Sequence, residues 1–170
     1  MKFGIERFIA DLQIDIAADV LASHEGSRPF DSPIEKLFYT CLWHALECHP
    51  RYRHLQVGAL DALTTAVGDD ASDIYIGWQV RVLDWPVDFA FKVRAASRDV
   101  TGLVCLAVEC DGHDFHERTK EQAARDRSRD RALQAAGYTV MRFTGSELYR
   151  DPMKCVREVL DWAYAGSERF

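Results

Sequence analysis

The sequence predicts one α/β domain, in which a mixed β-sheet is flanked by helices and preceded by an extra N-terminal helix. Apolar residues recur at helical spacing in the first fifty residues, and from Ile74 the period changes to two. A long polar helix then separates the third strand from a fourth. The predicted order is therefore α, β, β, β, α, β, α behind the extra helix, and 170 residues suffice for one core.

The extra helix is expected at about residues 3–22. Its apolar positions are Ile5, Phe8, Ile9, Leu12, Ile16 and Val20. Such a stripe is typical of a helix packed on the core, and a helix that binds a partner is the alternative. Residues 1–30 are therefore interpreted as an N-terminal helical extension, and residues 31–170 as the main domain.

The second helix has clear boundary signals. Ser32 can act as N-cap, Pro33 occupies the first helical position, and Glu35 stands where a capping box places its acid. The helix should end before Pro50. Its apolar stripe consists of Ile34, Leu37, Phe38, Cys41, Leu42 and Ala45.

The middle of the chain alternates between apolar and polar residues, as strands do. Residues 51–72 are ambiguous and fit either a short helix or irregular structure. Strands are expected at 74–83, 87–94 and 103–110, with a turn at residues 84–86 and a loop at 95–102.

The last third returns to helical patterns. A polar helix is expected over about residues 119–136, with Gly137 as its C-terminal stop. A fourth strand covers residues 138–143, and Asp151 with Pro152 opens a final helix. The stripe of that helix is Met153, Val156, Val159, Leu160 and Ala163.

The composition indicates a soluble protein of the cytoplasm. No apolar run reaches the roughly 20 residues of a membrane helix, and Glu6 and Asp11 interrupt the N-terminal apolar stretch where a secretory signal would carry none. The five cysteines form no CxxC pair and are expected to be free thiols. A zinc site at Cys41, His44 and Cys48, which share a helical face, is the alternative.

Acidic residues cluster on the second and third predicted strands. Alternation places Val87, Phe89, Phe91 and Val93 on one face of the second strand, and Asp88, Ala90 and Lys92 on the other. On the third strand, Cys105, Ala107, Glu109 and Asp111 share a face. The short connecting loop predicts an antiparallel pair, so Asp88 and Glu109 become cross-strand neighbours.

Neighbouring carboxylates repel each other and need a compensating cation. Mg²⁺ takes oxygen ligands, and a metal so held supports phosphodiester hydrolysis. The alternative is that these acids simply face solvent at the strand ends. The Gly112 turn directly after the acids favours a functional site.

The ordered motifs resemble a known nuclease superfamily. They are SPIEKLFYTCLW, QVRVLDWPVDFAFKV, LAVECDGHDFH and ARDRSRDRALQAAGYTVMRFTGSEL. Together, over about residues 32–150, they are similar to the PD-(D/E)XK nucleases, and more narrowly to small bacterial proteins related to very short patch repair endonucleases. The resemblance implies a restriction-endonuclease-like core of the order αβββαβ, a Mg²⁺ or Mn²⁺ cofactor and DNA as substrate, with RNA left open.

The resemblance also implies roles for three acids. Asp88 matches the metal-binding acid of the second core strand, and Glu109 matches the acid of the (D/E)XK element. Glu35 matches an acid on the preceding helix that reaches the metal, a role compatible with capping.

The family's lysine is absent, and Asp111 stands in its place. In the short-patch branch, which also lacks it, a histidine five positions further on is credited with proton transfer, and a backbone carbonyl helps to bind metal. His116 and the Cys110 carbonyl match these positions. A histidine suits general base chemistry near neutral pH, and stabilisation of the loop is the alternative role of His116.

The polar helix is locally basic in a chain with a net charge of −6. Residues 118–131 contain six basic and three acidic side chains. Lys120, Arg125 and Arg129 are candidates for phosphate contacts, and the resemblance favours Arg129 at the rim of the site. A solvated helix with ion pairs along one face is the alternative.

Three functions compete on these observations. The first is a Mg²⁺-dependent DNA endonuclease of repair or nicking type. The second, prompted by the missing lysine and the negative charge, is a nuclease-derived nucleic-acid-binding module without catalysis. The third is a protein-interaction domain, a homodimer among the options, with the N-terminal helix as the contact.

Overall fold

The computed structural model describes residues 32–68, 72–94, 102–112 and 120–168. The predicted N-terminal helix and extension lie outside these residues. The elements in chain order are α2 (Pro33–Cys48), β1 (Val57–Ala59), β2 (Ile74–Val82), β3 (Trp85–Arg94), β4 (Leu103–Asp111), α3 (Lys120–Ala135), β5 (Tyr138–Thr144), α4 (Gly145–Arg150) and α5 (Pro152–Glu168). The predicted α/β class with helices around a mixed sheet is confirmed.

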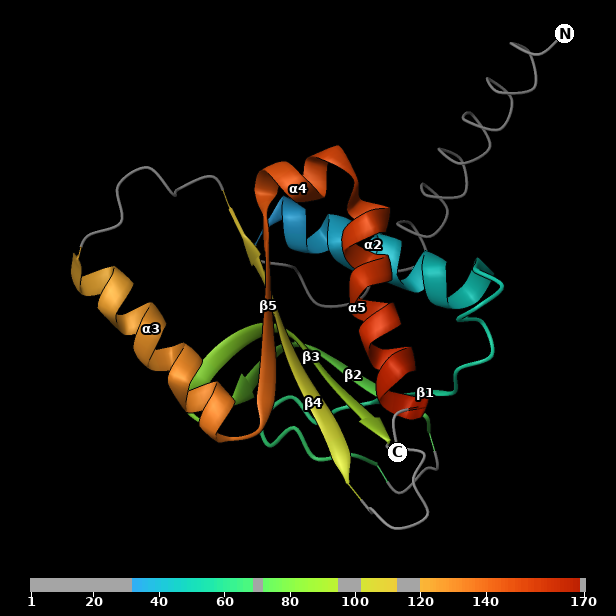
Figure 1. The fold of residues 1–170 in the computed structure, drawn as a ribbon, viewed down its shortest axis with the longest axis horizontal. Helices are drawn as coiled ribbons and strands as arrows, with labels where there is room; N and C mark the ends of the chain where they lie inside the picture. The colour runs from blue at the N-terminus through green and yellow to red at the C-terminus, as the bar shows by residue number, and fades with distance from the viewer. Residues whose placement is uncertain (1–31, 69–71, 95–101, 113–119, 169–170) are drawn as a thin grey trace, which may run out of the picture.

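The sheet has five strands in the order β1-β2-β3-β4-β5. β3 pairs antiparallel with both β2 and β4, which confirms the expected hairpin of β3 and β4. The two outer pairs, β1 with β2 and β4 with β5, are parallel. The sheet is therefore mixed, and α3 makes the crossover that a parallel β4–β5 pair requires (Figure 1).

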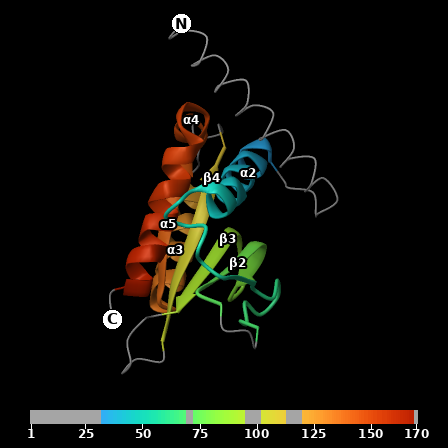
Figure 2. The same cartoon turned by 90° about the vertical axis from the view of Figure 1, so that its right-hand side faces the viewer.

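Two apolar clusters cover opposite faces of the sheet. The larger joins α2 and α5 to β3 and β4 and includes Phe38, whose ring centroid lies 4.9 Å from that of Phe89. The smaller lies under α3 and is built around Leu133 and Tyr138. Figure 1 shows α3 on one side of β5 with α2 and α5 on the other, and Figure 2 shows α2 and α5 packed together.

The helix boundaries follow the signals in the sequence. Ser32 caps α2, and its Oγ accepts a hydrogen bond from the Glu35 backbone N–H at 3.3 Å. Gly137 follows α3 with a φ of +85°, a left-handed conformation that glycine adopts without steric cost. Both signals act through local backbone geometry, so they can be read without knowledge of the tertiary structure.

Two local expectations are wrong, and one helix was not predicted. Residues 57–59 form a short strand, β1, rather than a helix or irregular structure. Trp85 and Pro86 belong to β3, so the turn is confined to residues 83–84, and Leu83 has a φ of +56°. A further helix, α4, begins after Thr144 with a complete capping box to Glu147.

The expected alternation along β3 is also wrong at one residue. Trp78 and Phe89 pair and lie with the larger cluster, whereas Val80 and Val87 pair and lie with the smaller one. Residues two apart on a regular strand would share a face. Gln79 has a φ of +47°, outside the extended range of a regular strand, so the alternation of side chains is interrupted at this residue. Asp88 lies between the two faces as a result.

Among the described residues, no helix combines the length and the apolar character needed to cross a membrane.

The conformation of Gly137 gives a first prediction. We expect Gly137→Ala to lower the free energy of unfolding by about 1–2 kcal/mol, because a Cβ at positive φ is strained even though no atom lies within 4 Å of its position. Gly137→Asn should cost less, since asparagine tolerates this conformation better. Urea denaturation measures both values, and equal stabilities of the alanine variant and the parent would contradict the prediction.

Candidate active site

The pairing of β3 with β4 brings two acids together at one end of the sheet. The antiparallel register pairs Phe89 with Val108, so Asp88 and Glu109 are the next residues at this end of the two strands. The Cys110 backbone N–H donates a hydrogen bond of 2.7 Å to Asp88 Oδ2, which fixes the aspartate against β4. Glu109 is only 5% exposed. The expected cross-strand arrangement of these two acids is therefore present.

Burial disfavours the charged form of both acids. It raises the pKa of Asp88 to about 6, against a smaller lowering by the Cys110 N–H; Glu35 and Asp111 raise it further. It raises the pKa of Glu109 to about 7, although the positive charge of Arg129 acts in the opposite direction. Each pKa shift is in the direction expected for carboxylates withdrawn from water with too little positive charge nearby.

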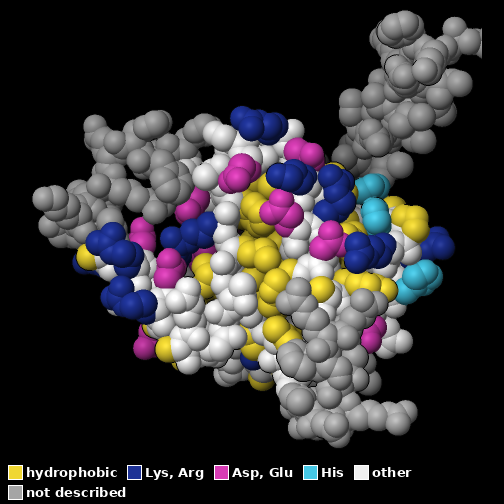
Figure 3. Space-filling model, in the orientation of Figure 1, with side chains coloured by type: hydrophobic (Ala, Val, Ile, Leu, Met, Phe, Trp, Pro, Cys, Tyr) yellow, Lys and Arg dark blue, Asp and Glu magenta, His cyan; other side chains and the backbone are white. Residues whose placement is uncertain are grey.

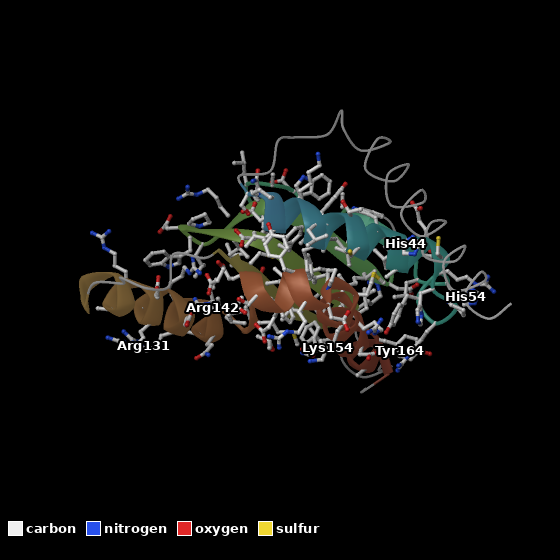
Figure 4. The ribbon with its side chains drawn as sticks, turned by 90° about the horizontal axis from the view of Figure 1, so that it is seen from above. His44, His54, Arg131, Arg142, Lys154 and Tyr164 are labelled. Atoms are coloured by element: carbon white, nitrogen blue, oxygen red, sulfur yellow. The ribbon has the colours of Figure 1, made fainter. Side chains whose placement is uncertain are left out.

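Two arginines lie near Glu109. Arg129 on α3 places Nη2 at 2.7 Å from Glu109 Oε2. Arg142 is the residue of β5 paired with Glu109 in the parallel register, and Nη2 of Arg142 bonds to Asp130 of α3. Figure 4 shows Arg142 alongside α3. Within the described parts of the chain, buried Glu109 Oε1 has no hydrogen-bond partner.

Glu35 reaches the same region from α2. Its side chain is buried, and its charge contributes to the raised pKa of Asp88. Ser32 Oγ donates to Glu35 Oε1 at 2.6 Å, and Gln79 Nε2 donates to Oε2 at 3.3 Å. Both carboxylate oxygens of Glu35 are therefore already engaged, in line with its expected role at the helix start.

The remaining sequence candidates are spread around this centre. Asp111 is half-buried at the end of β4, where it pairs with Thr144. Arg125 is exposed on α3. Lys120 begins α3, but its side chain lies outside the description, and His116 lies outside the described residues altogether.

Lys92 does not supply a positive charge to the acids. Its Nζ donates to the backbone carbonyl of Thr65 at 2.6 Å, so it fixes the segment that follows β1. The position of Lys92 on the face opposite the larger cluster was foreseeable, but its partner in a distant loop was not.

Two residues near the acids were not foreseen. Arg142 could have been found, because it follows Tyr138 and Val140 at alternate positions and is the charged member of that otherwise apolar face. Gln79 gave no such signal. It contacts Glu35 where the alternation of side chains along β2 is interrupted.

The two acids fit a divalent cation that needs only one or two protein carboxylates as ligands. No group of three or more His, Cys, Asp or Glu side chains stands ready to hold a metal among the described residues. Mg²⁺, however, is often bound by one or two carboxylates, with water and substrate phosphates completing its shell. Asp88 and Glu109 supply hard oxygen ligands, and the unpartnered Glu109 Oε1 leaves a position for a cation.

Basic side chains gather beside these acids on α3. Arg125, Arg127 and Arg131 are exposed, while Arg129 is turned toward Glu109. Figure 3 shows dark-blue side chains grouped over this helix, next to acidic ones. A negatively charged polymer could therefore approach the acids along α3 despite the negative net charge.

The mixed sheet with helices on both faces, and the acid pair at the ends of its central strands, define a protein of the restriction-endonuclease-like class. The family model REase_MTES_1575 matches residues 71–162, and the chain belongs to this restriction endonuclease-like family. Membership indicates a nuclease. Asp88, Glu109 and Arg129 lie within the matched segment, whereas Glu35 lies outside it. No curated protein and no solved structure matches the chain.

The raised pKa of Asp88 gives a second prediction. In EDTA at pH 8 we expect Asp88→Asn to raise the melting temperature by roughly 2–4 °C, the change that about 1 kcal/mol produces in a domain of this size. Asparagine keeps an acceptor for the Cys110 N–H and removes the buried charge.

The pH dependence of stability explains why Asp88→Asn should stabilise the protein at pH 8. A carboxyl whose pKa is raised from 3.8 to about 6 binds its proton more tightly in the folded state, so stability falls as pH rises from about 4 to 6. Asp88→Asn should lessen this fall. Asp61→Asn is the matched control, because hydrogen bonds from Thr64 lower the pKa of exposed Asp61 and its removal should not stabilise. A lower melting temperature for Asp88→Asn at pH 8 would contradict the prediction.

Proposed function

We propose that the protein is a divalent-metal-dependent endonuclease that hydrolyses phosphodiester bonds of DNA. The observation that carries the proposal is the pair of half-buried Asp88 and buried Glu109 on neighbouring strands, with Glu109 Oε1 unpartnered among the described residues. Membership in a restriction endonuclease-like family supports it. Two acids in that state are poor structural elements, because burial disfavours their charge, but they are suitable ligands for Mg²⁺ or Mn²⁺.

Each residue then has a stated task. Asp88 and Glu109 bind the metal, with the Cys110 carbonyl as a further ligand. Asp111 and Glu35 surround these ligands with negative charge, and Glu35 also holds the start of α2. The bound metal would polarise a phosphoryl oxygen and lower the pKa of a coordinated water. His116 accepts the proton of the attacking water in this proposal.

Substrate binding is assigned to α3. Arg125 and Lys120 are proposed to contact DNA phosphates, and Arg129 lies at the rim of the acid pair. Phosphate contacts of this kind orient a duplex without reading its sequence. We propose a repair or nicking role in the cytoplasm, on the basis of the resemblance to proteins related to very short patch repair endonucleases.

A second candidate is a nuclease-derived module that binds nucleic acid without cutting it. Two observations favour it. Asp111 stands where related nucleases carry lysine, and Arg129 already contacts Oε2 of Glu109, a proposed metal ligand. Binding of Mn²⁺ and DNA without cleavage over a broad panel of substrates would establish this function instead.

The acids give a third prediction. Asp88→Asn and Glu109→Gln should each reduce Mg²⁺- or Mn²⁺-dependent cleavage by about 100-fold or more, because metal coordination supplies several kcal/mol to the transition state. Plasmid nicking and linearisation measure the rates, and EDTA should abolish both. Glu158→Gln, which removes an exposed acid on α5, is the control. If both variants cut as fast as the parent, the site assignment is wrong.

The basic helix gives a fourth prediction. Arg125→Gln should weaken DNA binding and reduce the slope of log affinity against log salt by about 0.9, the value for one lost phosphate contact on duplex DNA. Fluorescence anisotropy in Ca²⁺ at several salt concentrations measures both. Arg150→Gln removes a positive charge from exposed α4 and is the control. If Arg125→Gln leaves the slope of log affinity against log salt unchanged, Arg125 does not contact a DNA phosphate.

A further inference from the structure

The contact between Arg129 and Glu109 is unusual for a buried ion pair. It joins one nitrogen to one oxygen at 2.7 Å, with side-chain exposures of 17% and 7%. Arg129 Nε and Glu109 Oε1 have no hydrogen-bond partners within the described ranges. An arginine and a carboxylate that serve a purely structural purpose commonly form two parallel bonds. Here each group keeps a buried polar atom unsatisfied, which costs free energy.

The two arginines beside Glu109 differ in how they are held. Arg142 Nη2 bonds to Asp130, so an acid on α3 keeps it in place. Arg129 has an ion pair only with Glu109 among the described residues. Its side chain is 17% exposed, so part of it borders solvent. Arg129 is thus the more easily displaced cation.

We propose that Arg129 is a displaceable counter-cation. In the metal-free protein it neutralises Glu109. When a divalent metal binds, Arg129 moves away from that carboxylate and contacts a phosphate of the substrate. This inference rests on the proposed function. It assigns Arg129 the positive charge that the absent motif lysine would supply beside the acids. A planar guanidinium with several donors suits a phosphate at least as well as a carboxylate. Arg129 therefore competes with the metal for Glu109 and binds the phosphate of the substrate.

The proposal predicts opposite effects of one substitution on two ligands. Without Arg129, a metal no longer competes with a cation for Glu109, so metal should bind more tightly. The substrate phosphate, in contrast, loses its partner. A scaffold role predicts instead that loss of the ion pair weakens both, because Glu109 would lose its orientation.

Calorimetric titration of the full chain with Ca²⁺ tests the first effect. We expect Arg129→Gln to lower the Kd for Ca²⁺ by about tenfold or more, as removal of a unit positive charge at close range implies. Arg129→Lys should restore a Kd within about threefold of the parent, because the charge that competes with the metal is kept. Arg150→Gln is the matched control, since it removes an exposed positive charge from α4 and none from α3.

DNA affinity tests the second effect. The parent should bind duplex DNA more tightly in Ca²⁺ than in EDTA, and Arg129→Gln should lose most of that gain, while Arg150→Gln retains it. A Ca²⁺ affinity of Arg129→Gln equal to or weaker than that of the parent would overturn the proposal. A gain in DNA affinity from EDTA to Ca²⁺ that is as large for Arg129→Gln as for the parent would also overturn the proposal.

Glu109→Gln separates this inference from the proposed function. If the parent binds Ca²⁺ and Glu109→Gln does not, the metal site is supported whatever the Ca²⁺ affinity of Arg129→Gln. If the Ca²⁺ affinity of Arg129→Gln then equals that of the parent, only the displacement proposal is overturned. If neither the parent nor Arg129→Gln binds Ca²⁺, the metal site and the displacement both fall. Thermal unfolding of each variant in EDTA shows that it is folded before it is titrated.

Discussion

The withdrawal of two neighbouring carboxylates from water, half-buried Asp88 on β3 and buried Glu109 on β4, is the constraint on which this structure depends. Strand pairing fixes Asp88 against the Cys110 N–H, and the sheet encloses Glu109. Withdrawal from water raises both pKa values, and the positive charge of Arg129 does not offset this for Glu109. Such an unfavourable arrangement on the central strands is typical of a functional site.

The arrangement of α3 follows from this constraint. Leu133 is fully buried and anchors the helix to the sheet, which brings Arg129 over Glu109 and Asp130 to Arg142. Because α3 has little apolar character, it is held to the sheet by Leu133 and by ion pairs. Its outer face remains basic. In a chain with a net charge of −6, this local charge rather than the total determines where a polyanion can bind.

Several features were not predictable because they arise between segments distant in sequence. β1 is three residues long and exists through its parallel pairing with β2, where Gly58 lets the Tyr75 ring approach closely. The interrupted alternation at Gln79 separates Val87 from Phe89, and no residue type at position 79 demands it. α4 is a different case, because Thr144 and Glu147 form a capping box whose spacing is visible in the sequence.

The sequence by itself determined the order of the main elements, most of their boundaries and the acids Asp88 and Glu109 as neighbours. Hydrophobic period, helix caps and a short hairpin loop are local properties, and they suffice for these conclusions. Only the tertiary structure decided that Arg129 contacts Glu109, that Arg142 lies beside it and that Lys92 is bound elsewhere. Those outcomes depend on how α3 and β5 dock against β4, and docking is set by packing of the whole core, which no local pattern encodes.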